Sequence, residues 1–219
     1  MRSVRVVGAG ILLLVGTLSA CGSEVPSSHE TIAPQSDPSP TEIVYVEADC
    51  QAAQITPGLY RYTSNPDYRI AQATVGSMGT PVDASVGDGH TTAFTPVTLS
   101  SVSTIGGNGA ISMSTVWVEG GSTSSVTVYG DDYPGFTTGA TVVVAVRDVP
   151  GLGSQVSEVF PVVSNNVYLL EPCWTADDSS QRTQPIALAF AFGPAKGTDE
   201  TFEGVTMPLP QFVDLVEDL

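Results

Sequence analysis

The chain consists of short runs of β-branched and aromatic residues, interrupted about every ten residues by clusters of glycine, proline, asparagine and serine. Runs of this length and composition predict β-strands, and no helical period appears before the last residues. The expected strands are 43–46, 59–62, 94–102, 111–118, 126–129, 141–146, 156–163, 167–170 and 186–192. The sequence therefore predicts an all-β fold, either a sandwich or a single antiparallel barrel.

Some runs also predict where a strand lies in its sheet. Residues 141–146 and 186–192 are apolar on both faces, which is typical of central strands that are covered on both sides. In 111–118, Trp117 shares its face with Ile111 and Met113, and we expect that face to be buried. Asn165 and Asn166 between two apolar runs favour a hairpin.

The last ten residues carry the one helical pattern. Phe212, Leu215, Val216 and Leu219 lie at i, i+3, i+4 and i+7, with acidic residues opposite them. We expect a short C-terminal helix that packs against the β-structure. The alternative is an acidic, hydrophobic tail that docks a partner.

The order of these elements resembles a known layout over residues 92–219. It includes Gly120-Gly121, the turn Tyr133-Pro134-Gly135-Phe136, the apolar strand and the late helical pattern. Small secreted bacterial β-domains with an OB-like barrel share this layout. The resemblance implies a barrel rather than a sandwich, and it carries no functional residues over to this chain.

The N-terminus resembles the signal peptide of bacterial lipoproteins. Arg2 and Arg5 precede the apolar stretch 6–14, and Leu18-Ser19-Ala20-Cys21 matches the lipobox. The resemblance implies that residues 1–20 are removed and that Cys21 is lipidated. The protein is then expected on the extracytoplasmic face of the cell membrane, held by its lipid anchor. An ordinary secretory signal with a chance cysteine is the alternative.

Two regions follow the signal. Residues 21–42 are rich in serine, proline and glutamate and contain almost no large apolar side chains. This composition predicts a disordered tether behind the lipidated N-terminus. Residues 43–219 are long enough to bury a core, and we expect them to form one β-domain.

The chain is strongly acidic. Seven Lys and Arg stand against 23 Asp and Glu, a net charge of −16, which becomes −18 once Arg2 and Arg5 leave with the signal. Nucleic acids are bound through clustered basic residues, so a nucleic-acid partner is not expected.

The cysteine count favours a disulfide. Of three cysteines, Cys21 is assigned to the lipid, which leaves Cys50 and Cys173 at the two ends of the β-rich region. A disulfide is the default for such a pair in an oxidising compartment, and two buried thiols are the alternative.

Signals for catalysis and for metals are weak. His90 lies with Ser85 and Asp88 in a polar loop that has no nucleophile motif, so we assign no catalytic residue and expect no cofactor. Asp131, Asp132 and Asp148 are the candidate calcium ligands, although acidic residues also favour turns by themselves.

Three aromatic residues are the candidate binding residues. Tyr133, Phe136 and Trp174 lie in predicted loops, where they either form an exposed contact surface or pack onto the core. The functional expectation is a non-enzymatic binding module for an envelope protein or polysaccharide. The alternatives are a structural or protective lipoprotein, such as an exclusion factor, and a cell-wall hydrolase.

Overall fold

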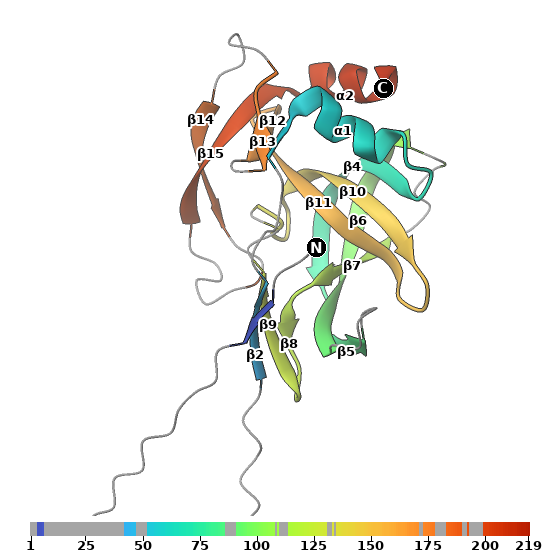
Figure 1. Cartoon of the computed structure of the whole chain (residues 1–219), viewed down its shortest axis with the longest axis vertical. Helices are drawn as coiled ribbons and strands as arrows, with labels where there is room; N and C mark the ends of the chain where they lie inside the picture. Colours follow the sequence, from blue (N-terminus) through green and yellow to red (C-terminus); the bar gives the residue numbers. More distant parts are fainter. Residues whose placement is uncertain are drawn as a thin grey trace, which may run out of the picture.

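The computed structural model describes most of the chain from residue 52 onward (Figure 1). The described residues are 4–6, 42–46, 52–85, 91–107, 109, 114–130, 133, 135–170, 173–177, 183–189, 192 and 199–219, with the backbone alone for 4–6, 42–46, 130 and 199. Cys21 and nearly all of the predicted tether lie outside them. The lipobox, tether and domain boundaries therefore stay predictions.

Strands make up most of the described chain, so the predicted all-β class is confirmed. The strands are β1 (Val4–Val6), β2 (Glu42–Val46), β3 (Ala53–Gln54), β4 (Tyr68–Met78), β5 (Val82–Ser85), β6 (Thr91–Gly107), β7 (Thr115–Glu119), β8 (Gly121–Ser122), β9 (Val126–Gly130), β10 (Thr141–Val149), β11 (Gly153–Val163), β12 (Asn166–Leu170), β13 (Trp174–Thr175), β14 (Thr183–Ala189) and β15 (Asp199–Pro208). The described helices are α1 (Ile55–Thr63) and α2 (Leu209–Asp218).

Five strands form a closed circuit of pairings. β10 pairs antiparallel with β4 on one side and with β11 on the other. β4 continues antiparallel to β6 and β6 to β7, and β7 returns to β11 through a parallel pairing between Trp117 and Gln155. From β11 the same sheet extends through β12 and β15 to β14.

Alternate residues of β10 supply two separate hydrophobic clusters. Val142, Val144 and Val146 pack with side chains of β4, β6, β7 and β11 in the cluster that we call the inner cluster. Val143 and Ala145 pack in the second cluster, the outer cluster, where α1, α2 and β13 cover the outside of the circuit. Because both faces of this strand are buried, its apolar run is continuous, as the sequence predicted.

The segment 59–62, predicted as a strand, belongs instead to helix α1. Its buried side chains Ile55, Leu59 and Tyr62 recur at i, i+4 and i+7 and face the outer cluster. The side chain of the N-cap residue makes no capping bond. The Asp177 carboxylate accepts hydrogen bonds from the Thr56 N–H at 3.1 Å and the Thr56 hydroxyl at 2.7 Å. This distant acid caps the helix.

Two other predictions about strand position are wrong. β14 pairs with β15 alone among the described residues and leaves Ala187 exposed, so residues 186–189 of the predicted strand are not central and covered on both faces. In β7 the fully buried side chains are Val116 and Val118, whereas Trp117 is only half-buried. The pairing of β7 with β6 turns the valine face toward the inner cluster.

The hairpin and the C-terminal helix are confirmed. β11 and β12 are joined by Ser164 and Asn165, whose φ angles of 50° and 63° are those of a two-residue hairpin turn. Helix α2 packs on β6 so closely that a Cβ at Gly106 would lie 2.4 Å from Val216 Cγ1. The C-terminal segment therefore packs against the β-structure.

We predict that Gly58→Ala destabilises the protein. A Cβ at Gly58 would lie 2.5 Å from Trp174 Cζ3, so the overpacking cost of about 1–3 kcal/mol outweighs the roughly 1 kcal/mol that alanine normally gains over glycine in a helix. Urea unfolding of Gly58→Ala, Trp174→Phe and the double variant measures the effect. The double variant should lose less stability than the sum of the single losses, and strictly additive losses would contradict the assigned contact.

Candidate functional site

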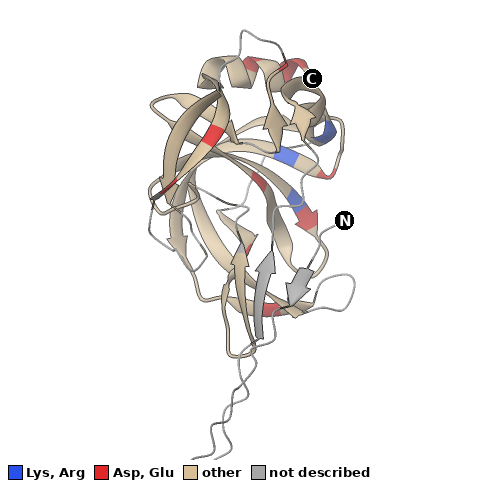
Figure 2. Cartoon of the chain, turned by 60° about the vertical axis from the view of Figure 1, so that its left-hand side comes forward, with Lys and Arg blue, Asp and Glu red and all other residues tan. Residues whose placement is uncertain are grey.

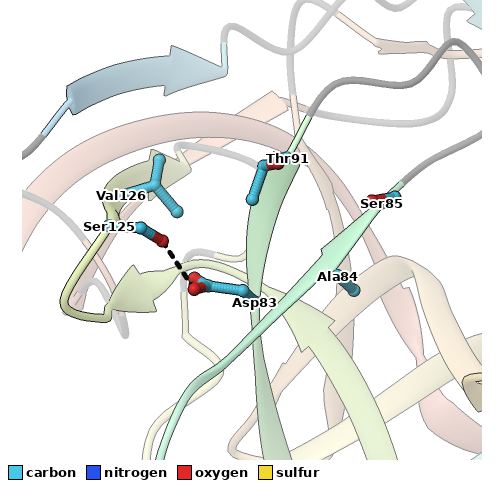
Figure 3. Close-up of a pocket in the computed structure, with 6 residues that line it drawn as sticks. All are labelled: Asp83, Ala84, Ser85, Thr91, Ser125 and Val126. Atoms are coloured by element: carbon cyan, nitrogen blue, oxygen red, sulfur yellow. Dashed lines mark hydrogen bonds between the residues drawn. The ribbon is translucent and has the colours of Figure 1, made fainter.

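The candidate site is a polar pocket of about 390 Å³ beside β5 (Figure 3). β5 and the first residue of β6 form one wall, and the turn between β8 and β9 forms the other. The lining residues are Asp83, Ala84, Ser85, Thr91, Ser125 and Val126. Its volume is at the small end of the range for ligand pockets.

Hydroxyl groups from the opposite wall fix the carboxylate of Asp83. The Thr123 hydroxyl donates to Oδ1 and the Ser125 hydroxyl donates to Oδ2, each at 2.5 Å. These two bonds, that of Ser125 first, hold the pKa of Asp83 below its usual range. Figure 3 shows the carboxylate directed at Ser125 across the pocket. Asp83 is therefore an anion in a defined orientation.

The tight turn that carries Ser125 is stabilised locally. The Thr123 hydroxyl accepts a hydrogen bond from the Val126 N–H at 3.1 Å, and the Thr123 N–H donates to the Val126 carbonyl at 2.9 Å. Behind the turn, Val126 packs with Ala93 and Val128 in a small buried cluster. Val126 thus joins the wall of the pocket to a small buried apolar cluster.

A second pair of hydroxyls lies on the β5 wall. Ser85 and Thr91 face each other in the antiparallel register of β5 and β6, and both side chains are exposed. Within the described part of the chain, neither hydroxyl has a hydrogen-bond partner. Both are available to donate to or accept from a ligand.

From the sequence, Asp83, Ser85 and Thr91 were expected only as parts of a polar loop. Asp83 to Ser85 form strand β5 and Thr91 begins β6, whereas His90 and Asp88 lie outside the described residues. The signal that would have revealed the pocket is the pairing of Asp83 with Ser125 over 42 residues. Local sequence patterns do not contain a contact of this length.

Of the two places expected for Tyr133 and Phe136, an exposed surface or the core, the structure shows the core. Both side chains are buried in the inner cluster, with their ring centroids 6.4 Å apart. The Tyr133 hydroxyl donates to the Val156 carbonyl at 3.2 Å, so its polar end is satisfied inside the fold. The loop closes over the core because burying these rings removes large apolar surfaces from water.

Trp174 is also buried rather than exposed. Its ring packs beneath α1 and against Phe160, with centroids 5.3 Å apart. Beside it, the Ala53 N–H donates to the Cys173 carbonyl at 3.1 Å. Neither Trp174 nor the other two aromatic residues lines the pocket. Cys50 lies outside the described residues, so its bond to Cys173 stays a prediction.

The candidate calcium ligands are not brought together in the described chain. Asp131 and Asp132 lie outside it, and Asp148 forms an ion pair with Arg69 and accepts a hydrogen bond from Ser154 at 2.6 Å. The Arg69 bond, followed by that of Ser154, lowers the pKa of Asp148. No group of three possible metal-ligating side chains occurs among the described residues. Asp148 therefore has a structural partner, and the calcium site stays untested.

The described basic side chains gather at the end of the domain that carries α1 (Figure 2). They are Arg61, Arg69 and Arg147, and Arg61 lies 3.9 Å from the Glu158 carboxylate. Tyr62 donates to that carboxylate at 2.9 Å, and burial, then the charge of Glu158, raises the pKa of its phenol above the usual range. This end is held by ion pairs, whereas β5, β8 and β9, which carry or flank the pocket, lie toward the opposite end of the domain (Figure 1).

Comparisons add no assignment to this geometry. A scan against protein-family models found no match, and searches of curated proteins and of solved structures returned none. Within the described residues, neither helix has the length and apolar character needed to cross a membrane.

Proposed function

We propose that the protein is a lipid-anchored envelope module that binds an envelope protein or polysaccharide without catalysing a reaction. The lipobox at Cys21 supports the anchor. The observation that carries the binding role is the pocket beside β5, with its fixed carboxylate and available hydroxyls.

The chemistry of the pocket favours binding over hydrolysis. Activation of a serine needs a neighbouring group that accepts its proton. Asp83 lies beside the Ser125 hydroxyl, but its lowered pKa makes it a poor base. Asp83 therefore orients the hydroxyl rather than activating it.

We further propose that the five-stranded circuit is an OB-like barrel rather than part of a sandwich. Its support is that each of its strands, β10, β4, β6, β7 and β11, has a partner on both sides within the circuit. Such closure removes exposed strand edges, which is the defining property of a barrel.

A Cys50–Cys173 disulfide belongs to the same proposal. β13 pairs with β3 so that Trp174 lies opposite Ala53, three residues after Cys50. Digestion without reducing agent should yield a linked peptide that contains both cysteines. Recovery of both as separate thiol peptides from the exported protein would contradict the pairing.

We predict that Cys21→Ser releases the protein from the membrane. Two or more acyl chains give firm attachment, and the variant has no site for them. Fractionation and incorporation of an alkyne-palmitate label measure the change, with Cys50→Ser as a cysteine variant that keeps the anchor. Equal amounts of wild type and Cys21→Ser in the membrane fraction would contradict the anchor.

We predict that Ser85→Trp reduces capture of the partner at least tenfold. Ser85 is an exposed lining residue, so a tryptophan there fills the pocket without entering the core. Capture from envelope extracts, read by mass spectrometry, compares the wild type with this variant. Ser103→Trp makes the same exchange at an exposed position of β6 away from the pocket, and its capture should be unchanged.

Capture that Ser85→Trp leaves intact would move the binding site away from the pocket. An empty capture by the folded wild type would favour a structural or protective lipoprotein. Turnover of cell-wall material that Ser85→Trp abolishes would instead favour a hydrolase.

A further inference from the structure

We propose that the pocket beside β5 recognises an ammonium group on a small hydroxylated ligand, with Asp83 as its counter-ion. This inference rests on the proposed function and adds the chemical class of the ligand.

Asp83 is prepared to receive a cation. Its two carboxylate oxygens each accept one hydroxyl hydrogen bond, which leaves further lone pairs on both oxygens. Because Thr123 and Ser125 already hold the side chain, binding requires little loss of side-chain freedom. Among the described lining residues Asp83 is the one titratable group, and its lowered pKa keeps it charged at neutral pH.

The hydroxyl oxygens complete the acceptor set. An ammonium group has three hydrogens to donate, and one carboxylate does not satisfy all of them. Ser85 and Thr91, unpartnered among the described residues and opposite each other, supply further acceptors on the same wall. Their hydroxyls can also donate to hydroxyl oxygens of the same ligand.

Other ligand classes fit the lining less well. Calcium takes six to eight oxygen ligands and usually several carboxylates, whereas the described lining residues offer one carboxylate. An anionic ligand meets Asp83 and a chain of net charge −16. A neutral sugar finds no aromatic ring among the described lining residues. An amino sugar or another small hydroxylated amine fits both the charge and the volume of about 390 Å³.

The test measures binding of glucosamine to the full mature chain by ligand-observed saturation-transfer NMR, with N-acetylglucosamine as the probe that lacks the positive charge. We expect glucosamine to bind at least tenfold more tightly than N-acetylglucosamine. Asp83→Asn, which removes the charge and keeps an oxygen acceptor for one of the two hydroxyls of Thr123 and Ser125, should lose this preference. Thermal unfolding confirms that the variant is folded.

Asp67→Asn is the matched control. Asp67 is an exposed aspartate in the turn between α1 and β4, at the end of the domain opposite the pocket, and the exchange removes the same charge. Its binding of glucosamine should equal that of the wild type. Equal losses in Asp67→Asn and Asp83→Asn would show general charge attraction and would overturn the proposal.

The pH profile gives a second, independent readout. Below about pH 7 the ligand amine is protonated, so binding should persist as pH falls and be lost only when Asp83 itself is protonated, below the usual range for aspartate. Ser125→Ala removes the first cause of the lowered pKa and should move this loss to higher pH. An unmoved profile would overturn the role of Asp83.

These outcomes separate the inference from the proposed function. Failure of glucosamine to bind, or equal binding of N-acetylglucosamine, overturns the ammonium site. If the wild type then still captures a partner and Ser85→Trp abolishes that capture, the proposed binding module is retained and its ligand is of another class.

Discussion

The fold depends on the closure of β10 with β11. β10 has β4 on its other side, so this one antiparallel pairing joins the two ends of the circuit. Val142 to Val146 are fully buried as a result, and both hydrophobic clusters draw on them. Loss of the pairing would expose two strand edges and uncover both clusters at once.

The two ends of the domain use their polar groups differently. At the α1 end, Glu158 contacts Arg61 and Tyr62, and Asp148 pairs with Arg69. The charged side chains there link elements of the fold. At the β5 end, the hydroxyls of Thr123 and Ser125 orient the Asp83 carboxylate, and the described residues bring no cationic side chain to it. A rigid scaffold that presents a charged group at one end, without a cationic partner among the described residues, is a common arrangement for binding sites.

The sequence predicted the strands whose burial is regular, and it missed elements that depend on distant contacts. For the apolar run 141–146 and the hairpin at Asn165, the local sequence is enough to predict the structure. Helix α1 is not predictable in this way, because Pro57-Gly58 resembles a turn in the sequence. The residues that stabilise the helix, Asp177 and Trp174, lie far along the chain. The pocket was missed for the same reason, and the sequence left the burial of the three aromatic residues open because a loop position does not determine burial.

The cap on α1 also has a consequence for the order in which the molecule can form. Thr56 and Asp177 are 121 residues apart, so the helix must wait for nearly the whole chain before its N-terminus is satisfied. Contacts of such long sequence separation form slowly, because the entropy of closing the loop is lost before the contact stabilises the fold. Until Asp177 reaches Thr56, the N-terminus of α1 lacks its cap.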